Sequence, residues 1–170
     1  VFLAWTAYSF VFLLDALRQR GRRFQLPPGS RLMDTGGFKG RTREVRRSDL
    51  LELYLEFLGL PEEYVVNEYG MTELSSQFYD RRIGHHSNMP VLRGPSWTRC
   101  LAVDAETLEP LPDGAQGLIR IVDLANFWSV AAIQTEDIGS VGKDGGLILN
   151  GRAEGAQLRG CSLTVEELLT

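Results

Sequence analysis

The sequence contains little cysteine, carries no strong charge of one sign and has no long apolar run. Its 170 residues include two cysteines, Cys100 and Cys161, which provide no disulfide framework and favour a reducing, cytoplasmic location. The formal net charge of −4 argues against broad nucleic-acid binding. No internal repeat or low-complexity segment interrupts the chain, so we expect an ordinary folded protein rather than a repeat array.

The most apolar segment is the first 14 residues, VFLAWTAYSFVFLL. A helix of that length is too short to cross a bilayer, so we expect no membrane span. The segment has no basic leader and no small-residue cleavage site, which argues against a signal peptide. Because no methionine starts it, we interpret it as the buried beginning of a helix in a chain that lacks its own start.

Helical and strand patterns alternate in the first part of the chain. Hydrophobic spacing predicts two helices and two strands, in the order helix 6–20, strand 31–34, helix 47–60 and strand 64–70. Ser48 or Asp49 is expected to cap the second helix, and Gly59 followed by Pro61 to end it. This order indicates an α/β fold with a parallel layer.

The pattern changes after Pro90, where alternating residues and tight turns predict a β-meander or a small distorted β-barrel. We expect a further hairpin over residues 139–152 and the start of a helix over residues 164–170. We therefore expect three portions: an α/β part over 1–95, a β-rich subdomain over 96–150, and a hinge with a C-terminal segment over 151–170.

Two predicted strands end in polar turns that contain glycine, DTGG (34–37) and NEYGMTE (67–73). Ligands of open α/β sheets lie beyond the carboxyl ends of the strands. Gly36 and Gly37 would let a flat ligand approach the backbone. Tyr69 offers a stacking face, Thr72 a hydroxyl for phosphate, and Glu73 an oxygen ligand for Mg²⁺. The residues alone favour the alternative, a strand end capped by Thr72 with Glu73 beginning a helix.

Four segments in order resemble motifs of the adenylate-forming superfamily, which includes acyl-CoA synthetases, luciferases and adenylation domains. NEYGMTE is similar to its Y-G-x-T-E core, TGG (35–37) to its adenine-pocket segment, QTEDIG (134–139) to its T-G-D segment, and NGRAEGAQLRG (150–160) to its G-R-x-D…R-G segment. Asp137 and Arg152 are 15 residues apart, close to the spacing in that superfamily.

Three longer segments resemble the acyl-protein synthetase branch, the long-chain-fatty-acid–protein ligases: MDTGGFKGRTREV, VVNEYGMTELSSQFYD and LRGCSLTVEEL. The resemblance covers about residues 5–170 but only the second half of the usual family length. It implies ATP- and Mg²⁺-dependent activation of a fatty acid as acyl-AMP. It also implies transfer of the acyl group to an enzyme cysteine, for delivery to an acyl-CoA-reductase-type partner in bioluminescence-type fatty acid reductase systems.

The resemblance assigns a role to each matching residue. The nucleotide contacts it implies are adenine for Gly36, Gly37 and Tyr69, the α-phosphate for Thr72, the ribose hydroxyls for Asp137, and ribose or phosphate for Arg152. Gly70 is also assigned to the nucleotide site. It further implies that Glu73 binds Mg²⁺ and that Glu154 occupies the hinge position. Cys161 would be the acyl acceptor, with Arg159 lowering its pKa; the alternative is a cysteine that fills a gap in the core.

The sequence departs from the superfamily pattern at several points. Glu136 replaces the glycine of the T-G-D segment, and the segment from Arg152 to Gly160 is one residue short and lacks its common lysine. The Ser/Thr/Gly-rich phosphate loop and a C-terminal lid with its catalytic lysine are also missing. Two alternatives therefore stay open: an acyl- or aryl-CoA ligase of the phenylacetate type, and a nucleotide-binding module without catalysis.

Overall fold

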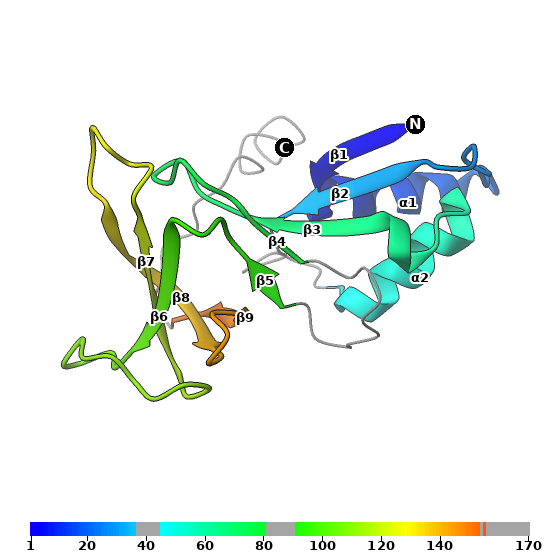
Figure 1. The fold of residues 1–170 in the computed structure, drawn as a ribbon. Coiled ribbons are helices and arrows are strands. Elements are labelled where there is room, and N and C mark those ends of the chain that lie inside the picture. The colour runs from blue at the N-terminus through cyan, green and yellow to red at the C-terminus, as the bar shows by residue number, and fades with distance from the viewer. Residues whose placement is uncertain (37–44, 81–90, 154, 156–170) are drawn as a thin grey trace. The chain divides into compact units, whose positions relative to one another are not determined.

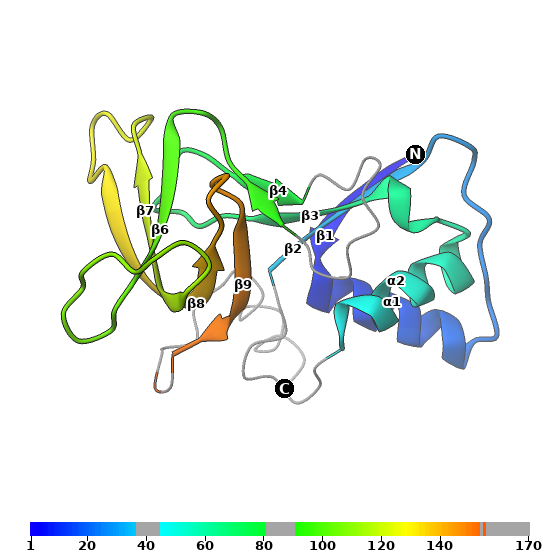
Figure 2. The same cartoon turned by 60° about the horizontal axis from the view of Figure 1, so that its bottom comes forward.

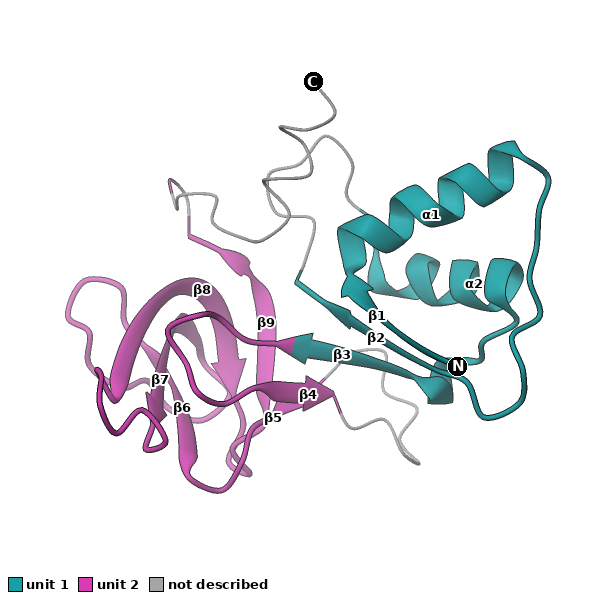
Figure 3. Ribbon diagram, turned by 90° about the horizontal axis from the view of Figure 1, so that it is seen from above, with its two compact units in different colours: residues 1–68, 82–88, 158–170 teal, residues 69–81, 89–157 magenta. Residues whose placement is uncertain are grey.

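The computed structural model describes residues 1–36, 45–80, 91–153 and 155. These residues form two compact units, the first ending at Glu68 and the second beginning at Tyr69 (Figure 3). The domain boundaries expected near residues 95 and 150 stay a prediction.

The first unit is a parallel sheet with helices on one face (Figure 1). Its elements are β1 (Phe2–Thr6), α1 (Ala7–Gln19), β2 (Arg31–Thr35), α2 (Arg47–Leu58), the short 3₁₀ helix η1 (Glu62–Tyr64) and β3 (Val65–Tyr69). The strands pair in the order β1-β2-β3, with Leu3 opposite Leu32 and Leu32 opposite Val65. The expected parallel α/β layer is confirmed.

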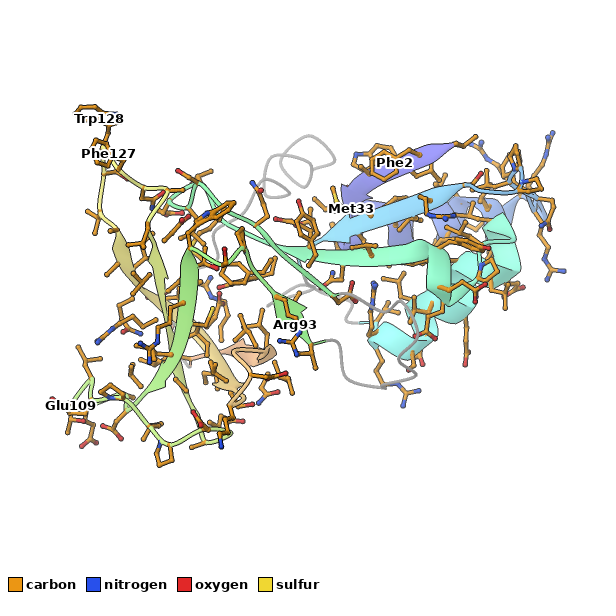
Figure 4. The ribbon with its side chains drawn as sticks, viewed as in Figure 1. Phe2, Met33, Arg93, Glu109, Phe127 and Trp128 are labelled. Carbon is orange, nitrogen blue, oxygen red and sulfur yellow. The ribbon has the colours of Figure 1, made fainter. Side chains whose placement is uncertain are left out.

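Both helices bury their apolar residues against one face of this sheet. Phe10 of α1 meets Tyr54 of α2 edge to face, with ring centroids 5.4 Å apart, and Leu32 and Val65 of the sheet belong to the same buried cluster. Successive residues of a strand point to opposite faces of the sheet. Phe2 and its partner Arg31 lie on the face away from the helices, and Met33, two residues after Arg31, lies on that face too (Figure 4).

The opening residues correct one expectation, because Phe2–Thr6 form a strand rather than the start of a helix. Phe2 is 64% exposed and Trp5 is 58% exposed, so the segment is not buried. A short apolar run suits a strand as well as a helix, and pairing with β2 decides between them. The helix begins after Thr6, whose hydroxyl accepts a hydrogen bond from the Ser9 amide at 3.1 Å.

The sequence predicted the C-terminal end of α2 correctly but not its N-terminal cap. Gly59 ends the helix in the left-handed conformation with φ +64°, as expected. The N-cap is Arg46, without a side-chain cap, so the expected capping by Ser48 or Asp49 is wrong. Asp49 instead lies in the first turn, where its charge suits the helix dipole and its carboxylate pairs with Arg46.

A buried carboxylate lies near the carboxyl end of β2. Asp34 is fully buried, accepts hydrogen bonds from Tyr54 Oη at 3.0 Å and Asn67 Nδ2 at 2.8 Å, and pairs with Arg47 of α2. Burial and the charge of Asp34 raise the pKa of Tyr54 above its ordinary value. These contacts attach α2 and β3 to β2, so the ends of the two strands lie next to each other.

The second unit is antiparallel (Figure 2). Its strands are β4 (Phe78–Asp80), β5 (Leu92–Arg93), β6 (Thr98–Val103), β7 (Gln116–Asp123), β8 (Ala132–Val141) and β9 (Leu147–Arg152). Their order is β4-β5-β9-β8-β7-β6. Strand β6 lies at an edge, and the described strands form an open sheet, so the expected β-meander is confirmed and the sheet is not a closed barrel.

Alternating residues of these strands build the second core. Ile119, Ile121 and Leu147 are fully buried, and Phe78 and Leu92 pack in the same cluster. The β7–β8 loop carries its aromatic residues outward instead, with Phe127 79% and Trp128 94% exposed (Figure 4). Within the described parts of the chain, no helix has the length and apolar character to cross a membrane.

Candidate functional site

Tyr69 and Asp137 are joined by a hydrogen bond in the second unit. Tyr69 ends β3 and is 9% exposed, and its hydroxyl donates to Asp137 Oδ2 at 2.7 Å. Asp137 lies in β8 and is 6% exposed. Burial, and then the charge of Asp137, raise the pKa of Tyr69, so this hydroxyl keeps its proton and remains a donor.

Arg152 lies opposite Asp137 across the β8–β9 pair. Its Nε is 3.3 Å from Asp137 Oδ1, and its Nη2 donates to Glu136 Oε2 at 3.0 Å. The Arg152 side chain is largely buried, whereas that of Glu136 is 53% exposed. One guanidinium therefore contacts two acidic residues that are neighbours in the sequence, one buried and one at the surface.

A β-bulge produces the Asp137–Arg152 contact. Gly139 pairs with Leu149 and Ile138 with Gly151, so Asn150 is the extra residue of β9. Uninterrupted pairing from Gly139 onward would place Gly151 opposite Asp137. Gly151 has φ +129°, a backbone conformation that side chains disfavour, and no atom lies within 4 Å of the place a Cβ would take. Conformation rather than space therefore requires glycine at this position.

The carboxylate of Asp137 is suited to a ligand with hydroxyl groups. An ionised carboxylate accepts hydrogen bonds through two oxygens, and hydroxyl groups are among its ordinary donors. Its backbone is held too, because the Asp137 amide donates to Thr135 Oγ1 at 3.1 Å and that hydroxyl donates to the Ile119 carbonyl at 2.7 Å. Asp137 is thus a rigid anionic group of the kind that binds hydroxyls.

The turn after β3 presents the two other polar residues of the motif. Thr72 and Glu73 are exposed, and the Thr72 hydroxyl donates to Glu73 Oε2 at 3.1 Å. Leu74 is buried in the core of the unit and anchors the turn. Residues 70–77 contain no helix, so the alternative in which Glu73 begins one is wrong. The turn therefore projects a hydroxyl and a carboxylate from a fixed apolar anchor.

Two residues that the sequence analysis missed hold this turn from the β7 side. Asp123, the last residue of β7, accepts hydrogen bonds from the amides of Ser75 and Ser76. Asn126 donates from Nδ2 to the Glu73 carbonyl at 2.8 Å. The available signal was the polar sequence DLAN directly after an alternating strand, which marks the strand end but not its partner.

The remaining predicted residues lie elsewhere. Gly36 follows β2 in the first unit with φ +72° and has open space on the side where a Cβ would lie, and Gly70 directly follows Tyr69. Gly37, Glu154 and Cys161 fall outside the described residues. The other cysteine, Cys100, is buried in the core of the second unit, and burial raises the pKa of its thiol to about 12.

The acidic residues suit a metal held jointly with a ligand. Among the residues that the structure describes, no three of His, Cys, Asp and Glu gather as a metal site. Glu73 offers a single exposed carboxylate. Mg²⁺ is commonly bound by one or two carboxylates together with substrate phosphates and waters, so Glu73 fits such an ion if phosphates share it.

Several solved structures share this fold. ATP-bound MatB from Rhodopseudomonas palustris has a TM-score of 0.60 at 19% identity, covering 89% of this chain and 31% of that one. A long-chain-fatty-acid-CoA ligase from Archaeoglobus fulgidus has a TM-score of 0.61 at 16% identity, covering 99% of this chain and 36% of the other. The described architecture is therefore shared with these solved structures.

The family follows from the sequence match. The family model described as "Acyl-protein synthetase, LuxE" matches residues 2–170, and the chain belongs to this family. A "Long-chain-fatty-acid--luciferin-component ligase" from Vibrio harveyi is 25% identical over 170 residues, covering 95% of this chain and 43% of the relative. A protein of the same name from Aliivibrio fischeri is 26% identical over 135 residues, covering 78% and 34%. The chain thus spans less than half the length of these curated relatives.

Proposed function

We propose that the full-length protein activates a long-chain fatty acid with ATP and transfers the acyl group to a cysteine thiol. The observation that carries the proposal is the Asp137 carboxylate, held in place between Tyr69 and Arg152. A buried, oriented carboxylate is suited to two neighbouring hydroxyls such as those of a ribose. The membership in the acyl-protein synthetase family supports the choice of fatty acid and thiol.

In this proposal the nucleotide is held by residues at the end of β3 and on strands β8 and β9. Asp137 accepts hydrogen bonds from the ribose hydroxyls, and the guanidinium of Arg152 contacts ribose or phosphate. Tyr69 contributes to the adenine site, and Gly70 follows it directly in the chain. The assignment of Gly36 and Gly37 to adenine rests on the sequence motif and stays a prediction. Because Tyr69 is mostly buried and bonded to Asp137, it also fixes the direction of that carboxylate.

Thr72 and Glu73 act on the phosphates in the first reaction. The carboxylate oxygen of the fatty acid attacks the α-phosphorus of ATP, pyrophosphate leaves, and acyl-AMP is formed. Thr72 donates its hydroxyl to an α-phosphate oxygen, and Glu73 supplies a carboxylate ligand for Mg²⁺. When bound there, Mg²⁺ neutralises negative charge on the phosphates. The exposure of both side chains on an anchored turn supports these roles.

The second reaction needs a thiolate. Its sulfur attacks the acyl carbon, the bond to AMP breaks, and a thioester and AMP result. Cys100 is unsuited because it is buried and its thiol, with a pKa of about 12, stays protonated at neutral pH. The resemblance to acyl-protein synthetases supports Cys161 as the acceptor, with Glu154 at the hinge. We further propose that this protein is cytoplasmic and that it delivers the acyl group to an acyl-CoA-reductase-type partner.

The decisive experiment loads the full-length protein with labelled fatty acid, ATP and Mg²⁺. We expect pyrophosphate release, and protein-bound label that hydroxylamine removes. Cys161→Ser should abolish the stable label while leaving pyrophosphate release intact, and Cys100→Ala should keep both. Background pyrophosphate release with a range of fatty acids would contradict the proposal. Label transferred to coenzyme A, when coenzyme A is added to the same mixture, would instead identify an acyl-CoA ligase.

A further inference from the structure

We infer that Asp123, assisted by Asn126, is a positioning residue for the turn that carries Thr72 and Glu73. The inference rests on the proposed function for the role of those two side chains. The geometry that supports it lies wholly within the described part of the second unit. It assigns a task to a fully buried carboxylate that the nucleotide contacts proposed above leave unused.

Asp123 accepts four hydrogen bonds at the end of β7. Its Oδ2 accepts from the Ser75 amide at 3.1 Å and the Ser76 amide at 2.9 Å. Its Oδ1 accepts from the Ser76 hydroxyl at 3.0 Å and the Ala125 amide at 3.0 Å. Hydrogen bonds to an ionised acceptor are stronger than neutral ones, so these donors compensate for burying the charge.

The contacts come from the adjoining ends of β6 and β7. Trp97 Nε1 donates to Ser76 Oγ at 2.9 Å, and the same hydroxyl donates to Asp123. Thr98, the next residue after Trp97, is paired with Asp123 across the β6–β7 ladder. The turn is therefore tied to a rigid sheet rather than to another loop, which gives positioning its precision.

Asn126 extends the attachment to Glu73 itself. Its Nδ2 donates to the Glu73 carbonyl at 2.8 Å and to the Val130 carbonyl at 3.2 Å, while its Oδ1 accepts from the Ser75 amide at 2.8 Å. The Ser75 amide is thus shared between Asn126 and Asp123. These bonds fix the backbone on both sides of Leu74 and leave the Glu73 carboxylate exposed.

The consequence is a fixed direction for the two projecting side chains. Leu74 and Ser76 point into the unit and are buried, whereas Thr72 and Glu73 point outward. A reacting group misplaced by about 1 Å can lose about a hundredfold in rate. Weakening the hold on Ser75 and Ser76 should therefore affect the phosphate and metal contacts more than the fatty acid site.

The test compares Asp123→Asn with Asp104→Asn in the full-length protein. Asp104 is a matched control because its Oδ1 also accepts two backbone amides and a hydroxyl, from Glu106 and Thr107, in a turn without site residues. We expect Asp123→Asn to speed hydrogen–deuterium exchange of the Ser75 and Ser76 amides. It should weaken Mg·ATP binding in calorimetry by about tenfold and lower kcat for acyl-AMP formation by about tenfold to a hundredfold. The KM for fatty acid should stay within about twofold.

Asp104→Asn should leave exchange at Ser75 and Ser76, Mg·ATP affinity and kcat within about twofold of wild type. If Asp123→Asn does not fold, Asn126→Ala leaves Asp123 in place and removes the bonds of Asn126 to Glu73, Ser75 and Val130. This variant should shift the same quantities in the same direction. Unchanged Mg·ATP affinity and kcat in the folded variants would overturn the inference. Wild-type protein that forms no acyl-AMP would instead overturn the proposed function, and amide exchange would still report the hold on the turn.

Discussion

Asp137 and Arg152 lie opposite each other on strands β8 and β9, with 3.3 Å between Asp137 Oδ1 and Arg152 Nε. Their contact depends on one extra residue in β9, because the bulge at Asn150 moves Arg152 into register with Asp137. Tyr69 completes the arrangement from β3. The proposed ribose site is thus a property of the strand pairing as much as of its residues.

The first prediction concerns the carboxylate of Asp137. Asp137→Ala should weaken ATP binding by roughly 2–4 kcal/mol, because charged hydrogen bonds to two hydroxyls are lost. Calorimetry on the full-length protein measures this. Asp144→Asn is the matched control, since Asp144 also pairs with an arginine, Arg93, but in the exposed β8–β9 turn. Equal ATP affinity in the Asp137 variant and in wild type would refute the ribose role.

The second prediction concerns the bulge. Gly151→Ala should destabilise the protein by about 1–3 kcal/mol, because alanine disfavours φ +129°. It should also weaken ATP binding, since a relaxed register moves Arg152 away from Asp137. Gly114→Ala, at φ +81° with equally open surroundings in a distant turn, should lose stability without losing ATP affinity. Equal losses of ATP affinity in Gly151→Ala and Gly114→Ala would contradict a specific role of the bulge in ATP binding.

The third prediction concerns Glu136, which stands where the superfamily has glycine. Its carboxylate pairs with Arg152 and competes with any anion that this arginine binds. Glu136→Gln should therefore raise ATP affinity about two- to fivefold at low ionic strength, an effect the size of an exposed ion pair. The gain should shrink as salt is added. Weaker ATP binding by this variant would indicate that Glu136 orients Arg152 instead.

The fourth prediction concerns alkaline pH. The pKa of Tyr69 is raised in the folded protein, so above about pH 10 the unfolded chain loses this proton first. The unfolded state then binds fewer protons, and the free energy of unfolding falls as pH rises. Tyr69→Phe should make that fall shallower by up to about 1.4 kcal/mol per pH unit, and lower stability by a constant amount below pH 10. Denaturant unfolding at several pH values measures both.

Tyr79→Phe, which makes the same change at a more exposed tyrosine, is the control variant for that measurement. Tyr54 has a raised pKa for the same reasons, burial and the charge of Asp34, so part of the slope should persist in Tyr69→Phe. A slope identical to wild type in Tyr69→Phe would show that the Tyr69–Asp137 bond does not set its proton affinity.

Local physics in the sequence determined much of the fold. Helical spacing located α1 and α2, Gly59 marked a helix end, and alternation with tight turns predicted the meander. These signals work because helix periodicity, left-handed caps and strand alternation depend on residues a few positions apart. The order of the motifs likewise indicated the family, and it selected Asp137 and Arg152 together.

Long-range pairing decided the rest. Phe2–Thr6 became a strand because β2 offers it a parallel partner, which no local pattern reveals. Asp123 reaches the amides of Ser75 and Ser76 from 47 or 48 positions further along the chain, and only the strand pairing brings them together. The sequence by itself therefore determined which chemical groups are present and where helices and turns fall. The tertiary structure decided which groups meet, because a register shift of one residue changes the partner of every side chain along a strand.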